Sequence, residues 1–430
     1  MDAPQGTLAE ARALDAQDEL RSYRERFLIP PAPDGQGESI YLCGNSLGLQ
    51  PKALKEEMLQ ELEDWGKLGV EGHFHGKHPW YAAHAPLREP AARLVGALPH
   101  EVVIMNSLTV NLHLLMTSFF RPEGTRTKLL IDAPTFPSDV YAVKSQLRAQ
   151  GLDPAEHLIT VGPREGEHTL RTEDLLAVLE AQGQEIALLL LGGVNYYTGQ
   201  LLELAPITKA AQAQGCLVGV DLAHAAGNAP LELHEWGVDF AAWCNYKYIN
   251  SGPGALAGAF VHERHLGRGG AEDFAAFTAR PRYEGWWGND PESRFEMGPE
   301  FVPVKSADAW QLSNPPILAL APIRVSLRIF DEVGIERLHE KTLRLTGYLE
   351  RLLDGISSEA LEVITPRDTE QRGCQLSILA HRDPEGLHQR LQAAGVICDF
   401  RRPNVIRIAP VPLYNSFEDC YRFADVLRSV

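Results

Sequence analysis

An aspartate and a lysine each follow a short apolar run in the middle of the chain. Asp221 ends the run 216–220 (CLVGV), and Lys247 stands three positions after the run 238–244. Such runs indicate buried strands of a parallel sheet, whose carboxyl ends meet at one edge. An amine there can hold a carbonyl cofactor as a Schiff base, while a buried carboxylate keeps a pyridine nitrogen protonated. Either residue alone would be a surface charge or a helix cap, but together they predict a pyridoxal phosphate site.

A polar turn at 106–111 (NSLTVN) offers a second part of such a site. It follows an expected strand and precedes an expected helix over 112–120, so its N–H groups and hydroxyls lie at a helix N-terminus. Phosphate binds well at such a place. A plain capping turn, with Ser107 or Thr109 as the N-cap, explains the segment equally well when it is judged alone.

The loop 133–139 (APTFPSD) follows another expected strand and carries an aromatic ring and a carboxylate. Phe136 could stack on a pyridine ring, which contributes about 0.5 to 1.5 kcal/mol beyond the burial of area. The alternative is a core phenylalanine beside a turn. Only the neighbouring strands favour the interpretation that Phe136 contacts a ligand.

The elements that must position these residues alternate between short apolar runs and helical stretches. The runs lie at 102–105, 128–132, 158–161, 186–191, 217–221, 240–244 and 255–261. Such alternation predicts an α/β fold with a mostly parallel, seven-stranded sheet covered by helices. After about residue 318 the pattern changes: we expect a long helix through Leu338 and Leu352, and short strands between helices in a smaller α+β domain.

Three regions are predicted along the chain. Residues 1–50 form an N-terminal helix, expected over 7–27, and a segment that packs on the small domain. Residues 51–310 form the large cofactor-binding domain, and residues 311–430 form the small C-terminal domain. The Gly- and Pro-rich stretch 267–307 is interpreted as a functional loop.

Composition restricts the class of protein. The chain has 430 residues, 44% of them hydrophobic, and a formal net charge of −17 with no basic tract. These values argue against a nucleic-acid partner or a membrane surface, and no apolar stretch has the length of a membrane span or signal peptide. The six cysteines form no CxxC pair, and the histidines show no metal-like spacing. We therefore expect a cytoplasmic protein without a bound metal.

Several longer segments resemble the kynureninases, which are fold-type I pyridoxal enzymes similar to class V aminotransferases. The matching segments are 41–49 (YLCGNSLGL), 76–80 (GKHPW), 136–139 (FPSD), 197–200 (YTGQ), 221–227 (DLAHAAG), 236–248 (WGVDFAAWCNYKY), 285–286 (GW), 312–317 (LSNPPI) and 409–417 (APVPLYNSF). The resemblance thus extends over nearly the whole chain.

This resemblance implies roles for individual residues. Lys247 would form the imine with pyridoxal phosphate, Asp221 would pair with the pyridinium, and Tyr246 would pass a proton. Trp286 and Asn314 would come from the partner subunit of a homodimer. The positions implied for the cofactor are Leu108, Thr109, Phe136, Ser138, Asp139, Gly192, Asp221, His224, Tyr246, Lys247, Trp286 and Asn314. Gly192 stands where some relatives have a serine, so only its backbone could serve.

The resemblance also implies the substrate and its contacts. Arg407 would bind the α-carboxylate, and His73 and Asn314 would lie near the aryl ring. The expected reaction is hydrolysis of L-kynurenine, or of its 3-hydroxy form, to anthranilate (or 3-hydroxyanthranilate) and L-alanine, in tryptophan catabolism and NAD biosynthesis. The sequence does not decide between the two substrates.

Two alternatives stay open at this point. A cysteine desulfurase or another class V enzyme would share the architecture, but a desulfurase needs a mobile nucleophilic cysteine. Cys374, which leads directly into an apolar run, is the only cysteine in a suggestive setting. A protein that binds pyridoxal phosphate without catalysis is the other alternative, although every chemical position is occupied.

Overall fold

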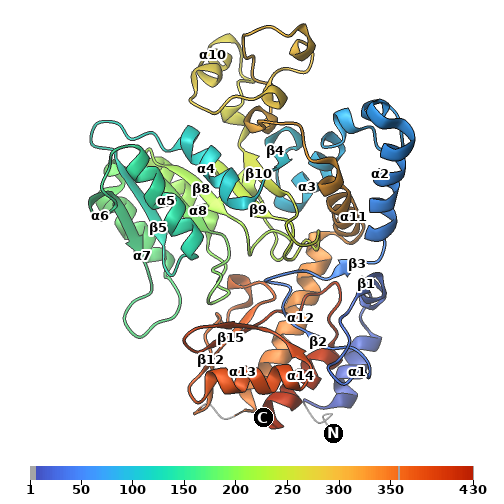
Figure 1. The fold of residues 1–430 in the computed structure, drawn as a ribbon. Helices are drawn as coiled ribbons and strands as arrows, with labels where there is room; N and C mark the ends of the chain where they lie inside the picture. Colours follow the sequence, from blue (N-terminus) through green and yellow to red (C-terminus); the bar gives the residue numbers. More distant parts are fainter. Residues whose placement is uncertain (1–5, 357–358, 430) are drawn as a thin grey trace.

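The seven apolar runs form one sheet in the computed structural model, which describes residues 6–356 and 359–429 (Figure 1). The strands are β4 (Val102–Met105), β5 (Lys128–Asp132), β6 (Leu158–Val161), β7 (Ile186–Gly192), β8 (Leu217–Asp221), β9 (Phe240–Cys244) and β10 (Ala257–Val261). Their order in the sheet is β4-β10-β9-β8-β7-β5-β6. β10 is antiparallel to both of its neighbours, and the other pairs are parallel. The mostly parallel sheet is therefore confirmed.

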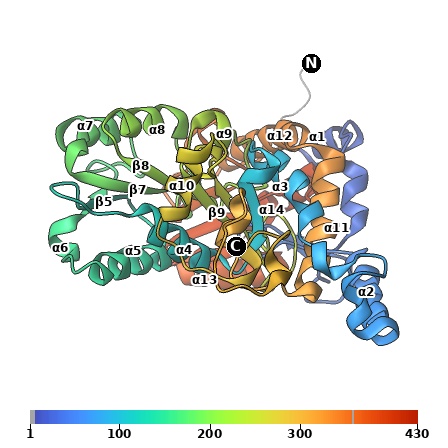
Figure 2. The same ribbon diagram turned by 90° about the horizontal axis from the view of Figure 1, so that it is seen from above.

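Helices cover both faces of this sheet. In Figure 2, α7 (Thr172–Gln182) and α8 (Leu204–Ala213) lie along one side, and α4 (Leu108–Phe119) and α5 (Pro137–Ala149) lie along the other. Because successive side chains of a strand point to opposite faces, the apolar strand β7 supplies two cores. Leu188 and Leu190 pack with α4 and α5, whereas Leu189 and Leu191 pack with α7 and α8.

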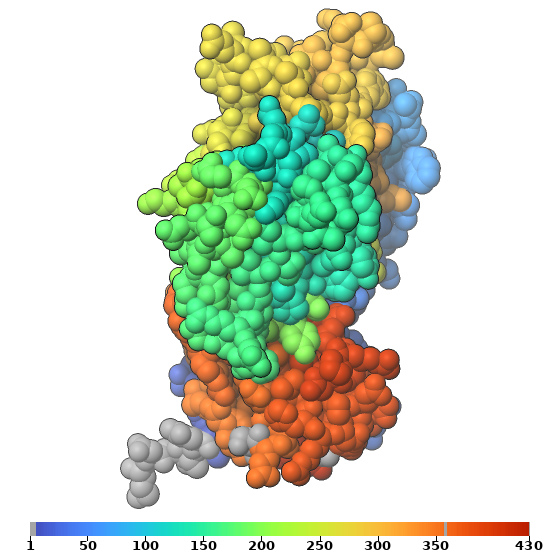
Figure 3. All heavy atoms as spheres, turned by 90° about the vertical axis from the view of Figure 1, so that its left-hand side faces the viewer, coloured from blue at the N-terminus to red at the C-terminus, as the bar shows by residue number. Residues whose placement is uncertain are grey.

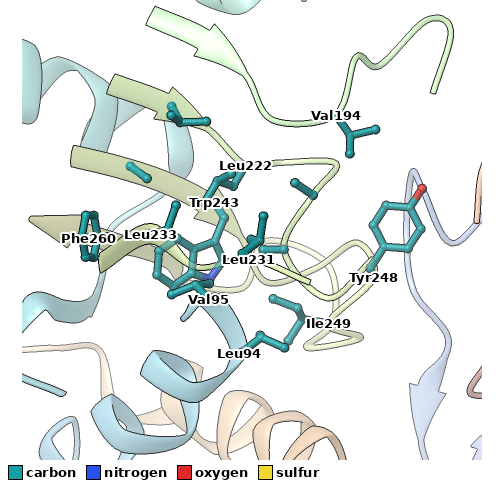
Figure 4. Packing of buried hydrophobic residues seen from close by; sticks show 14 of the residues in the cluster. Leu94, Val95, Val194, Leu222, Leu231, Leu233, Trp243, Tyr248, Ile249 and Phe260 are labelled. Atoms are coloured by element: carbon teal, nitrogen blue, oxygen red, sulfur yellow. The ribbon is translucent and has the colours of Figure 1, made fainter. Parts of the chain in front are cut away.

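The core beneath the carboxyl end of β9 is built around Trp243 (Figure 4). Trp243 is fully buried, and a Cβ at Gly258 on the neighbouring strand would lie only 2.1 Å from its indole ring. The indole Nε1 donates to Asn245 Oδ1 over 3.1 Å, and Asn245 Nδ2 donates to Leu256 O over 2.7 Å. These contacts hold the chain immediately before Lys247.

A second, four-stranded antiparallel sheet lies in the C-terminal part of the chain. Its order is β11-β12-β15-β14, with β11 at Leu361–Val363, β12 at Leu376–Ala380, β14 at Asp399–Arg401 and β15 at Val405–Ile408. The helices α13 (Pro384–Ala393) and α14 (Phe417–Ser429) accompany it. Figure 3 shows these orange and red residues below the green residues of the large sheet and its helices.

The long helix expected through Leu338 and Leu352 is confirmed, but a separate helix precedes it. The structure has two helices, α11 (Ile317–Val333) and α12 (Ile335–Asp354), which are separated at Gly334. Gly334 has φ 81°, a left-handed value that glycine adopts without steric cost. The break lets α11 pack against α2 (Leu54–Leu68) and α12 pack against α14.

The N-terminal helix is shorter than expected and packs on the C-terminal part. α1 (Leu8–Ala16) is followed by a separate 3₁₀ turn at Arg21–Arg26, so one helix over 7–27 is wrong. Asp15 accepts the N–H groups of Phe417 and Glu418 over 2.7 and 3.0 Å, and thereby caps α14. The three domain limits stay a prediction. In the described residues, no helix is both long and apolar enough to cross a membrane.

Candidate functional site

A cavity of about 460 Å³ lies at the carboxyl ends of β5, β7, β8 and β9. Its volume falls within the roughly 300 to 1,000 Å³ of small-molecule sites. The residues predicted for the site that line the cavity are Leu108, Thr109, Phe136, Ser138, Asp139, Gly192, Asp221, His224, Tyr246 and Lys247. The fold therefore brings most of the predicted cofactor positions together, because parallel strands deliver their following loops to one edge.

Lys247 is held beside a buried imidazole. Its Nζ lies 3.0 Å from Nε2 of His224, which is buried. Burial, together with the charge of Lys247, holds the pKa of His224 well below its usual range. The imidazole is therefore neutral and accepts a hydrogen bond from the amine. His224 Nδ1 is buried and has no hydrogen-bond partner among the described residues, so it can serve a ligand.

Three carboxyl groups gather at the same end of the cavity. Asp221 ends β8, and its Oδ1 accepts the N–H of Ala223 over 2.7 Å. Burial and the charge of Asp221 raise the pKa of Asp139, and burial raises the pKa of Asp132 to about 6. Oδ1 of Asp139 is buried without a partner within the described chain. Such a group of acids suits a cationic nitrogen, because a positive charge would satisfy the carboxylates.

Two helix N-termini meet at the cavity wall. α4 begins at Leu108, four residues earlier than expected, and α5 begins at Pro137. Thr109 Oγ1 and Ser138 Oγ lie 2.9 Å apart. Free N–H groups, hydroxyls and two helix dipoles favour a bound anion such as a phosphate. Ser107 stands at the N-cap but makes no capping hydrogen bond with its side chain, which leaves its hydroxyl at the cavity wall.

Gly192 lines the cavity, but its N–H already donates to Asp132 Oδ1 over 2.9 Å. The backbone N–H that could have replaced a serine hydroxyl is thus engaged. Phe136 is partly exposed on the cavity wall, and its ring meets the ring of Tyr196 edge-on at 5.2 Å. Because 40% of its surface is exposed, Phe136 is accessible to a ligand in the cavity.

A glycine turn packs directly on the loop that carries Lys247. The Gly48 N–H donates to Tyr246 O over 2.9 Å. A Cβ at Gly48 would lie 2.3 Å from Lys247 O, so only glycine allows this close approach. Tyr246 lines the cavity, and burial raises the pKa of its phenol. The phenol therefore stays protonated and can donate a proton.

Arg407 does not line the cavity wall. It is fully buried on β15, donates through NH1 to Tyr196 O over 2.6 Å, and pairs with Asp399 at 2.5 Å. Arg401, which the sequence analysis did not single out, lines the cavity instead. The guanidinium predicted to hold a carboxylate thus already has a carboxylate partner within the chain.

Three predicted residues lie away from the cavity. Trp286 is 47% exposed and packs on Trp287 and Phe295. Asn314 is exposed, and His73 is half-buried with its Nδ1 2.9 Å from Val70 O. This chain alone does not bring them to Lys247.

Other lining residues were missed by the sequence analysis. They are Asn45, Ser46, Asp132, Pro134, Thr135, Val194, Asn195, Tyr196, Ala223 and Arg401. Asn45 and Ser46 belong to the glycine turn, and Asp132 ends a predicted strand, so the pattern held a signal for them. No sequence signal indicated Arg401, because arginines are mostly found on protein surfaces.

Cys374 is not a mobile nucleophile. It is fully buried, and burial raises the pKa of its thiol to about 12. Its N–H donates to Asn228 Oδ1 over 2.8 Å. A thiol that stays protonated and enclosed cannot attack a substrate, which argues against the desulfurase alternative.

Glu101, His234 and His262 lie close enough together to hold a metal ion, a grouping that sequence spacing did not suggest. Glu101 Oε1 lies 3.0 Å from His234 Nδ1 and accepts the N–H of Glu263 over 2.7 Å. His262 Nδ1 accepts the N–H of Arg264 over 3.2 Å. These contacts engage the candidate ligand atoms within the chain.

Comparison with known proteins shows which family this chain is similar to. A family model described as the kynureninase C-terminal domain matches residues 338–427. A kynureninase from Myxococcus xanthus is 57% identical over 418 residues, which cover 97% of this chain and 96% of the relative. A kynureninase from Koribacter versatilis is 56% identical, with 95% and 94% of the two chains covered.

Solved structures support the fold. A cysteine desulfurase from Thermococcus onnurineus has a TM-score of 0.72 at 19% identity and covers 94% of this chain and 98% of its own. A cysteine desulfurase from Escherichia coli has a TM-score of 0.74 at 15% identity, with 95% and 97% covered. At such low identity these structures show the shared architecture alone.

Proposed function

The chain belongs to the kynureninase family, and on that premise we propose that it hydrolyses the Cβ–Cγ bond of L-kynurenine or its 3-hydroxy form. The products are anthranilate, or 3-hydroxyanthranilate, and L-alanine, with one water consumed. The observation that carries this proposal is the amine of Lys247, held 3.0 Å from neutral His224 in the same cavity as Asp221. The relatives that bear the kynureninase name, at 57% and 56% identity over nearly the whole chain, also support it.

The cavity fits pyridoxal phosphate as the cofactor. Lys247 would hold its aldehyde carbon, Asp221 and Asp139 would face the pyridine nitrogen, and the N-termini of α4 and α5 would take the phosphate. The unpartnered Oδ1 of Asp139 supports this fit, because a protonated ring nitrogen would supply the missing donor. When bound, the cofactor supplies an electron sink that labilises bonds at the substrate α- and β-carbons.

The residues of the chain then have separate tasks. Lys247 Nζ, as a free amine, can take the proton at the substrate Cα, because the neutral imidazole of His224 accepts its hydrogen bond and leaves no competing charge. Tyr246, with its raised pKa, donates a proton close to the γ-carbonyl as water adds there. Phe136, on the cavity wall, would stack on the cofactor ring. Arg407, which is buried beside the cavity and pairs with Asp399, would bind the α-carboxylate of the substrate.

We propose that the enzyme is a homodimer in the cytoplasm and that Trp286 and Asn314 complete the partner's site. Exposed apolar side chains on α2 and the following turn support a covered face: Trp65 is 60% exposed, and Val70 and Phe74 are also exposed. Met297, near Trp286 in the chain, is 75% exposed. Faces with several large apolar side chains usually pack against a partner. His73 would reach the substrate's aryl ring in the assembled site.

The test is direct. Purified protein with pyridoxal phosphate is given L-kynurenine, and anthranilate is followed by its fluorescence. Stoichiometric formation of anthranilate and L-alanine supports the proposal, and the same assay with the 3-hydroxy substrate ranks the two. Bound cofactor without anthranilate would identify a protein that binds pyridoxal phosphate without this catalysis. Sulfide release from L-cysteine would instead support the desulfurase alternative.

A further inference from the structure

One carboxylate joins two arginines beside the cavity. Asp399 Oδ2 accepts a hydrogen bond from Arg407 NH2 over 2.5 Å and from Arg401 NH2 over 3.0 Å. In the ladder between β14 and β15, Asp399 lies directly opposite Arg407. Arg401 follows Asp399 by two positions, so all three side chains lie on the same face of the sheet.

The two guanidinium groups keep free binding capacity. Nε of Arg401 and Nε of Arg407 are both buried, and neither has a hydrogen-bond partner in the part of the chain that the structure describes. A buried donor without an acceptor is costly. One carboxylate among two guanidinium groups also leaves a net positive charge, and Arg401 brings that charge to the cavity wall.

We propose that Asp399 is a positioning residue, which holds both arginines in place by accepting a hydrogen bond from each. We further propose that Arg401 is a second cation for the substrate carboxylate beside Arg407. Asp399 binds no substrate itself. It holds the buried Arg407 against Tyr196 O, and it orients Arg401, whose side chain remains 35% exposed. This inference rests on the proposed function, because it assumes an amino-acid substrate whose α-carboxylate enters this cavity.

An opposite role for Asp399 is also consistent with its contacts. Asp399 could merely compete with the substrate for the arginines, in which case its removal would raise the positive potential and tighten carboxylate binding. The two interpretations predict opposite signs for one substitution. Asp399→Asn keeps an oxygen acceptor of the same size but removes the charge, so it separates them.

The experiment measures the affinity of the pyridoxal phosphate-loaded protein for L-alanine and for L-alaninamide by calorimetry. The two ligands share the amine and methyl group and differ at the carboxylate. We expect Arg401→Gln and Asp399→Asn each to weaken L-alanine binding about 10-fold or more, as loss of a charge-assisted hydrogen bond does, with little change for L-alaninamide. For L-kynurenine, KM should rise more than kcat falls.

Arg402→Gln is the matched control. Arg402 is the next residue in the chain, but its side chain is 83% exposed and pairs with Glu385 over 3.2 Å. It should bind both ligands as the unaltered protein does. The inference is overturned if Arg401→Gln behaves like Arg402→Gln, or if Asp399→Asn leaves L-alanine binding unchanged or tightens it.

A variant that fails to fold does not end the test. If Asp399→Asn is unstable, Arg401→Gln alone still decides whether a second cation contributes, and Asp399→Glu, which restores the charge, should recover part of the preference for L-alanine. Failure of the proposed function has a different signature. In that case the unaltered protein would not cleave L-kynurenine, whatever its affinity for L-alanine.

Discussion

Lys247 Nζ and His224 Nε2 lie 3.0 Å apart at the carboxyl edge of the large sheet, between the loops that follow β8 and β9. Lys247 is half-buried and His224 is buried, so the hydrogen bond between them fixes the direction of the amine. Because burial keeps the pKa of His224 low, the imidazole cannot protonate and repel the amine near neutral pH. The pair thus presents one oriented amine to a cavity lined by acids.

Replacement of this amine should abolish turnover without unfolding the protein. We expect Lys247→Ala to lower kcat by at least about 10⁴-fold, because no other group can form the imine. Circular dichroism should remain unchanged. The matched control is Lys209→Ala on α8, which removes an exposed lysine and should retain full activity. Appreciable turnover by a pure Lys247→Ala preparation would refute the assignment.

Removal of the charge of Asp221 should slow the reaction more than it weakens the fold. Asp221→Asn keeps the acceptor for the N–H of Ala223 but cannot pair with a pyridinium, so we expect kcat to fall by about 10²-fold or more. Asp174→Asn, a change at a partly exposed aspartate that pairs with Arg164, is the control. A rate for Asp221→Asn equal to that of the control would place the electron-sink partner elsewhere.

The cofactor-free protein should lose stability as the pH rises through the range in which Asp132 ionises. Burial raises the pKa of Asp132 from 3.8 to about 6, so the folded state binds its proton more tightly than the unfolded state does. The cost is absent below pH 3.8, grows between pH 3.8 and 6, and reaches about 3 kcal/mol above that range.

Asp132→Asn tests this pH dependence. The amide keeps an oxygen for the N–H of Gly192 but carries no charge. Its free energy of unfolding should exceed that of the unaltered protein by up to about 3 kcal/mol at pH 7.5, and the difference should shrink toward pH 4.5. Chemical denaturation at the two pH values measures it. An equal difference at both would show that Asp132 is not the titrating group.

Features set by local sequence patterns could be predicted, whereas features set by contacts between distant parts of the chain could not. The strands of the large sheet were found almost to the residue because each is a continuous apolar run, as in Ile186–Gly192, buried on both faces. The separate helix α11 before Gly334 was not predicted, since a glycine within a helical pattern does not by itself mark a boundary. The burial of Arg407 against Asp399 depends on pairing between strands, which local patterns do not encode.

Cys374 provides a test that separates this enzyme from a desulfurase. It is fully buried and its thiol stays protonated, so Cys374→Ala should leave kcat/KM for L-kynurenine within about 3-fold, a change worth less than 1 kcal/mol in the barrier. The variant should unfold at slightly lower denaturant concentration because of the lost sulfur. Loss of activity in a folded variant would give the thiol a chemical role.

Hybrid dimers should reveal whether Trp286 and Asn314 act across the subunit interface. One subunit carries Lys247→Ala, and the other carries Trp286→Ala together with Asn314→Ala. If the sites are shared, each hybrid dimer has one site in which both lesions are absent and one in which both are present. Since random mixing makes half of the dimers hybrid, about a quarter of the wild-type activity should return.

The control for this experiment mixes Lys247→Ala with Asp221→Asn subunits. These two residues line the same cavity within one chain, so every site in such a hybrid keeps one lesion and no activity should return. Trp286 and Asn314 do not line that cavity, which is why their loss is expected to be complemented by a partner. If the first mixture stays as inactive as the control while light scattering shows a mixed dimer, both residues act within their own chain. If light scattering shows only monomers, the homodimer itself is refuted.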